Sequence, residues 1–182
     1  MDLFRGQQLL KANGAKIAAE YAFKAKQYIL VYFAHAASGG FTQVLREFYE
    51  VSSVKNPVNL SCDTIRSVVV LRPFYPFYQF QAVKDKGVVV IFVSSDRTPE
   101  EMMDFRAEYH STEWLAAPHE STLSDNLGAE FSVSALPLLV VTSLDGTVLT
   151  KDGRADVINY GPRALDIWTE GISKAKRNCT LL

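Results

Sequence analysis

The sequence predicts an α/β fold in which a central mixed β-sheet carries helices on both faces. Two short and nearly continuous apolar runs, residues 28–34 and 87–93, are typical of strands that are buried on both sides. Apolar residues at helical spacing follow each run. The turn signal Asp145-Gly146 then joins two further strands into a hairpin. Strands that alternate with helices and close on a hairpin favour a sheet between two helical layers.

The first elements have separate local signals. Residues 8–11 precede Asn13-Gly14, and this pair tolerates the positive φ angles of a tight turn after a strand. The run at 28–34 is the first buried strand. A helix is expected over residues 40–50, because four apolar residues make one stripe on it: Phe41, Val44, Leu45 and Phe48.

The second half repeats this alternation. After the strand at 87–93, Thr98 is placed to cap a helix and Pro99 suits its first position. A helix over 121–131 and strands at 138–142 and 147–150 follow. The last helix, over 162–176, is expected to bury three side chains: Leu165, Ile167 and Trp168.

The composition limits the class of protein. With 182 residues, of which 48% are hydrophobic, the chain can bury one sizeable core, so we expect a single domain over residues 1–182. A net charge of -1 does not favour a nucleic-acid binder. The N-terminus lacks the pattern of a secretory signal, and no apolar run approaches the ~18 residues of a spanning helix. We therefore expect a cytoplasmic monomer, with a nuclear or membrane-associated pool as the alternative.

Several blocks in order along the chain resemble the tryparedoxin and nucleoredoxin branch of the thioredoxin superfamily. The strand and first helix carry Tyr32-Phe33, Phe41-Thr42 and Phe48-Tyr49. The later blocks are Val93-Ser94-Ser95-Asp96, Trp114-Leu115-Ala116-Ala117-Pro118, Phe131-Ser132-Val133-Ser134-Ala135-Leu136-Pro137, Val140, Asp145-Gly146 and Lys151-Asp152-Gly153. The short nucleoredoxin-like proteins, the rod-derived cone viability factor group, also begin with a stretch like residues 1–28. The resemblance implies a thioredoxin-like fold, in which Pro137 follows a cis peptide bond and faces the active-site cysteines.

The cysteines of that family are missing here. The resemblance implies a Cys-x-x-Cys motif at the start of the helix after Tyr32-Phe33, but residues 34–40 contain no sulfur. We place the degenerate site at Ala37, Ser38, Gly39 and Gly40. The sequence therefore predicts no catalytic residue and no dithiol chemistry.

Other candidate residues carry little chemistry. Ser38 is a nucleophile only if a base such as His35 activates it, and no triad is visible. His110 and His119 have no partner at metal-ligand spacing, so we expect both on the surface, with no metal and no cofactor. Cys62 also lies in no such spacing. We expect His35, Ser38, Leu136 and Pro137 to line a groove for a protein or an extended peptide.

Residues 51–81 have no counterpart in the resemblance. This stretch ends in a run rich in aromatic residues and holds Pro73 and Pro76. One interpretation is a genuine insertion that forms an interaction loop or an edge strand. The other, which we favour slightly, is retained intron sequence, because Val51-Ser52 can be encoded by a splice donor and Phe80-Gln81 by a pyrimidine tract ending in CAG. Amplification of the transcript across this region distinguishes the two.

The last residues, 177–182, are expected to form a flexible tail. Cys179-Thr180-Leu181-Leu182 fits a prenylation motif, and Lys174, Lys176 and Arg177 precede it. An incidental cysteine at a frayed basic helix end explains the same residues and is favoured about twofold over lipidation of Cys179. Weak membrane association through the tail depends on that lipidation.

Two function classes follow. The first is a redox-inactive protein with the thioredoxin fold that acts by binding, in a signalling, trophic or chaperone-like role. The second is a thiol-disulfide oxidoreductase whose Cys-x-x-Cys loop is missing from this isoform or gene model. The identity of the partner or substrate is not encoded in any motif of the sequence.

Overall fold

The described strands form one mixed sheet in a computed structural model that describes residues 2–50 and 83–179. Its seven strands run in the order β2-β1-β5-β4-β3-β6-β7. They are β1 (Gln8–Leu10), β2 (Lys16–Ala18), β3 (Tyr28–Ala34), β4 (Val88–Ser94), β5 (Leu115–Ala116), β6 (Leu138–Ser143) and β7 (Val148–Thr150). β4 is parallel to β3 and to β5, and the other pairs are antiparallel. The prediction of an α/β fold with a mixed sheet is confirmed.

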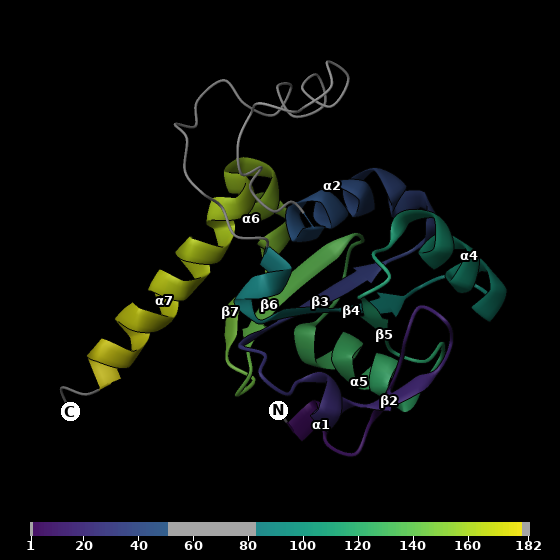
Figure 1. Ribbon diagram of the computed structural model, residues 1–182, viewed down its shortest axis with the longest axis horizontal. Coiled ribbons are helices and arrows are strands. Elements are labelled where there is room, and N and C mark those ends of the chain that lie inside the picture. Colours follow the sequence, from purple (N-terminus) through teal and green to yellow (C-terminus); the bar gives the residue numbers. More distant parts are fainter. Residues whose placement is uncertain (1, 51–82, 180–182) are drawn as a thin grey trace.

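Helices cover both faces of this sheet (Figure 1). One face packs against α2 (Gly39–Glu50), α4 (Pro99–Tyr109), α6 (Gly153–Tyr160) and the start of α7 (Ala164–Cys179). The other face packs against α5 (Thr122–Phe131), α1 (Ala19–Ala22) and the turn η1 (Asp2–Phe4). Short 3-10 turns complete the set: η2 (Ala36–Ser38), η4 (Val83–Lys86) and η5 (Gly161–Arg163).

Strand β3 is buried along its whole length because it lies between β4 and β6 under both helical layers. Tyr28, Leu30, Tyr32 and Ala34 point into the core under α2. Ile29, Val31 and Phe33, which alternate with them, point into the core under α5. The continuous apolar run of the sequence is therefore explained by two cores, one on each face.

The helix signals give the correct elements with some local differences. Thr98 caps α4 by accepting the Glu101 N–H at 3.1 Å, as predicted. Helix α6 and strand β2 were not predicted. Val44 and Ile167, which were expected in the core, are 37% and 41% exposed. Each lies on an apolar stripe, but on its outer edge, where no other described element covers it.

Candidate functional site

The loop after β3 caps the N-terminus of a helix with two side chains three residues apart, His35 and Ser38. His35 is the N-cap of η2, which continues directly into α2. Its Nδ1 accepts the Ala37 N–H at 3.1 Å, while its own backbone N–H donates to Ser38 Oγ at 3.5 Å. These reciprocal bonds form a capping box. The imidazole thus satisfies one backbone donor in the first turn of the helix, and the hydroxyl satisfies the N–H of the N-cap residue itself.

This geometry does not provide an activated serine. Ser38 is 6% exposed, so its hydroxyl is not accessible to a substrate. Since His35 Nδ1 accepts a backbone N–H, the neutral imidazole carries its proton on Nε2. Nδ1 is therefore already engaged and does not take a proton from Ser38. The site lacks the nucleophile and base pair that acyl-transfer chemistry requires.

Asp96 ties this loop to the end of β4. Its Oδ1 accepts the Ala36 N–H at 2.7 Å, and its Oδ2 accepts the Ser94 hydroxyl at 2.8 Å. His119 Nε2 donates to the Asp96 carbonyl at 2.8 Å. Against our expectation of a surface residue, His119 is half-buried, because it joins the segment before α5 to the end of β4. Asp96 and His119 thus hold the loop in place at the end of β4.

Leu136 and Pro137 lie on the other side of β3. The peptide bond between them is cis, and both residues are half-buried. β6 runs antiparallel to β3 with Phe33 opposite Leu138, so this peptide comes next to the end of β3 where His35 begins. The fold thereby brings all four predicted groove residues, from two distant parts of the chain, to the same end of the sheet.

Buried hydroxyl groups support the start of α2 from inside. Thr42 Oγ1 donates to the Ser38 carbonyl at 3.0 Å and lies 2.8 Å from the Tyr32 hydroxyl. Burial raises the pKa of Tyr32 to about 12, so this phenol stays protonated. On the outside, the Arg154 guanidinium lies 5.7 Å from the centre of the Phe41 ring.

The residues assigned to the degenerate site do not share one environment. Ala37 and Gly40 are exposed, whereas Ser38 and Gly39 are buried. A Cβ added at Gly39 would meet two atoms of the Tyr109 ring at 3.0 Å. The helix cap itself is at His35. The positions that combine an accessible N-cap with a buried partner three residues later are therefore His35 and Ser38.

The comparisons with known proteins agree with this geometry. Residues 26–148, more than half of the chain, match the family model described as Thioredoxin-like. The chain belongs to the thioredoxin-like family. Nucleoredoxin-like protein 1 of Homo sapiens is 34% identical over 103 residues, which cover 57% of this chain and 48% of that protein. The nucleoredoxin of Mus musculus is 30% identical over 83 residues, 44% of this chain and 18% of that protein. This thioredoxin-like protein is therefore nucleoredoxin-like, and it matches less than half the length of these curated relatives.

Solved structures show the same architecture. The thioredoxin related protein 16 of Carcinoscorpius rotundicauda, which has a role in regulating transcription factor NF-kB activity, superposes with a TM-score of 0.64. It is 29% identical, and the match covers 92% of this chain and 99% of that one. Tryparedoxin II complexed with glutathionylspermidine has a TM-score of 0.60 at 23% identity, over 86% of this chain and 88% of that one, and shows the fold alone.

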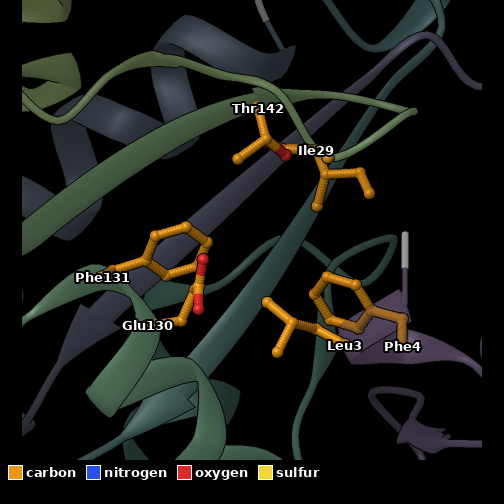
Figure 2. Close-up of a pocket in the computed structure, with 7 residues that line it drawn as sticks. Leu3, Phe4, Ile29, Glu130, Phe131 and Thr142 are labelled. Carbon is orange, nitrogen blue, oxygen red and sulfur yellow. The ribbon is translucent and has the colours of Figure 1, made fainter.

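A pocket lies on the α5 side of the sheet, between η1, α5 and the strands β3 and β6 (Figure 2). Leu3 and Phe4 face Glu130 and Phe131 across it, with Ile29 and Thr142 behind them. Its volume of about 30 Å³ is enough for a water molecule. It lies under α5 rather than at the His35 loop, so it does not extend the groove.

Among residues 2–50 and 83–179 of this thioredoxin-like protein, no cluster of histidine, cysteine and acidic side chains could hold a metal ion. No helix in the described part of the chain is long and apolar enough to cross a membrane. Cys62, residues 51–81 and the tail beyond Cys179 lie outside the described residues, as does the Cys179 side chain. The predictions made for them stay predictions.

One polar cluster was missed by sequence reasoning. His110, which was expected on the surface, is 8% exposed and lies between the rings of Phe92, Phe105 and Trp114. Neither ring nitrogen has a hydrogen-bond partner among the residues that the structure describes, and burial lowers the pKa of His110 to about 3. Its position one residue after α4 gave no sign of this burial, which comes from β4 and from the segment before β5.

Arg106 lies one helical turn before His110 and is also buried. Its Nη2 donates to the carbonyls of Leu10 and Trp114, at 3.3 and 3.4 Å, and no ion pair to it is formed within the described ranges. Burial lowers the pKa of Arg106. The guanidinium joins α4 to β1 and to the residue before β5, and it acts as a structural link.

Proposed function

We propose that this thioredoxin-like protein binds an extended segment of a protein partner in a groove between His35, at the helix cap, and Leu136 and Pro137, and does not reduce disulfides there. Ser38 supports this groove from inside, since it is buried beneath the cap. The capping box carries this proposal. A helix N-terminus activates a cysteine by stabilising its thiolate with free N–H groups. Here the Asp96 carboxylate accepts the Ala36 N–H and the His35 imidazole accepts the Ala37 N–H, and neither side chain can form a mixed disulfide.

The surface beside the cap supports peptide binding. Ala36 and Ala37 are exposed and small, so they leave the surface beside the cap open. Leu136 and Pro137 form a bend directly before the first residue of β6, so their backbone groups lie outside the strand ladder. An extended peptide gains affinity from main-chain hydrogen bonds at such a place. A signalling, trophic or chaperone-like role requires only such binding and no disulfide chemistry.

The alternative function is a thiol-disulfide oxidoreductase whose cysteine loop is missing from this form of the chain. One observation favours it. His35 and Ser38 keep the i, i+3 spacing of a Cys-x-x-Cys motif, with the first residue accessible and the second buried.

Precipitation of the insulin B chain, driven by dithiothreitol and followed by turbidity, tests both functions in one assay. A disulfide reductase shortens the lag before turbidity, whereas a protein that binds the released extended chain lengthens it. We expect the native chain to lengthen the lag. The double variant His35→Cys/Ser38→Cys is expected to shorten it, because both thiols then lie at the helix N-terminus.

A pair of matched variants assigns the effect to the groove. Ala37→Lys places a long side chain on the exposed cap and should abolish the delay. Ala107→Lys makes the same change on the exposed face of α4 and should leave the delay unchanged. A shortened lag with the native chain, or an equal delay from both lysine variants, would contradict the proposal.

A further inference from the structure

Strand β2 has one side that faces away from the sheet. The Ala19 N–H donates to the Gln7 carbonyl at 3.0 Å, and the Lys11 N–H donates to the Ala15 carbonyl at 2.8 Å. Antiparallel strands exchange such bonds at every second residue, so Ile17, midway between these two bonds, points its backbone groups towards β1 as well. The residues between them must point their backbone groups outward.

Those outward residues are Lys16 and Ala18. The N–H and C=O of Lys16 and the N–H of Ala18 are directed to the free side of β2. β2 is the end strand of the sheet, and no other strand within residues 2–50 and 83–179 pairs with this side. Ile17 anchors the strand by packing against the core under α5. The edge is thus fixed in position with a set of unpaired backbone groups, which is what an added strand requires.

The segment of the chain that contains this edge is basic. Residues 1–27 contain five lysine and arginine residues against two acidic ones. The five are Arg5, Lys11, Lys16, Lys24 and Lys26. Lys11 and Lys16 are exposed at the hairpin end of β2, and neither forms an ion pair with any residue the structure describes. Arg5 has an acidic neighbour, Glu20, whose carboxylate also accepts the Gly6 N–H.

We propose that the edge of β2 binds an acidic protein segment in extended conformation, as an additional strand. Unpaired backbone groups select an extended peptide, and the lysines select its charge. A second copy of this chain fits poorly, because pairing two β2 edges would bring their lysines together, and like charges opposite each other destabilise a strand pair. This surface lies at the opposite margin of the sheet from β7 and is separate from the groove at His35.

The test uses a synthetic peptide that alternates valine and glutamate and carries a fluorescent label. Binding is measured by fluorescence anisotropy, and hydrogen exchange of the Lys16 and Ala18 amides is measured by NMR. We expect binding that slows exchange at both amides. Lys16→Glu should weaken binding by about fivefold or more, since it replaces an attractive cross-strand pair by a repulsive one. Arg163→Glu, the same charge change on exposed η5, should have no effect.

A peptide N-methylated at alternate residues separates strand pairing from simple attraction of charge. It keeps the glutamates but cannot donate the ladder hydrogen bonds, so it should not bind. Equal binding of the methylated peptide, unchanged exchange at Lys16 and Ala18, or no binding at all would overturn the proposal. Loss of binding in Ala37→Lys would also overturn it, because the peptide would then occupy the groove instead.

Discussion

The buried imidazole of His110 makes the stability of this protein depend on pH. The pKa of His110 falls from 6.5 to about 3 on folding, because burial disfavours the charged form and Arg106 adds a like charge. The folded state therefore excludes a proton that the unfolded state binds. Stability is fully present above the unfolded pKa of 6.5 and declines as the pH falls below it, until the folded pKa is reached.

The size of the effect follows from the two pKa values. At pH 5, about 1.5 units below the unfolded pKa, protonation of His110 stabilises the unfolded state but not the folded state. This difference lowers the free energy of unfolding by about 2 kcal/mol. Phenylalanine in place of His110 keeps a planar ring between Phe92 and Trp114 and removes both ring nitrogens, which have no partner in the described part of the chain. His110→Phe should therefore lose less stability than the native chain between pH 7.5 and pH 5.

Urea unfolding at the two pH values measures this difference directly. The native chain and His110→Phe share all their other titrating groups, so the difference between their two losses isolates His110. His119→Gln is the control, because His119 is half-buried and its replacement can still donate to Asp96. Equal losses in the native chain and in His110→Phe would refute the reasoning, because the imidazole would then be protonated in the folded protein as well.

Three further outcomes are expected. Gly153→Ala should destabilise the fold by about 1–3 kcal/mol in urea unfolding, because the new Cβ would lie 2.8 Å from the Leu139 carbonyl oxygen. Gly128→Ala is the control and should not destabilise the fold, because a Cβ there meets no atom within 4 Å. Thr98→Ala should lower the free energy of unfolding by about 1 kcal/mol through loss of the α4 cap, and an unchanged urea midpoint would contradict this. Replacement of residues 51–82 by a short glycine and serine linker should leave the thermal transition cooperative, because α2 and η4 pack against each other at the two ends of that segment; a non-cooperative transition would show that the segment belongs to the core.

Much of the site could be predicted from local sequence. The buried strand 28–34, the sulfur-free stretch after it and Leu136-Pro137 are all visible in the sequence and through the family resemblance. Their convergence follows from the register of β6 against β3, which no local pattern contains. The placement of the helix cap at His35, rather than at Ala37, depends on which side chain reaches the Ala37 N–H. Because this loop is shorter than the family's, the sequence alone does not show which of its residues takes the position of the cap.

The sequence by itself determined the fold class, the main strands and the capped helices, because hydrophobic periodicity and caps act over a few residues. Only the tertiary structure decided which polar residues are buried and which apolar ones are not. His110 and Arg106 are buried because β1, β4 and the segment before β5 meet at the end of α4. Val44 and Ile167 stay exposed because no other described element packs over the outer edges of their helices. Burial is a property of what lies across from a residue, and that partner comes from elsewhere in the chain.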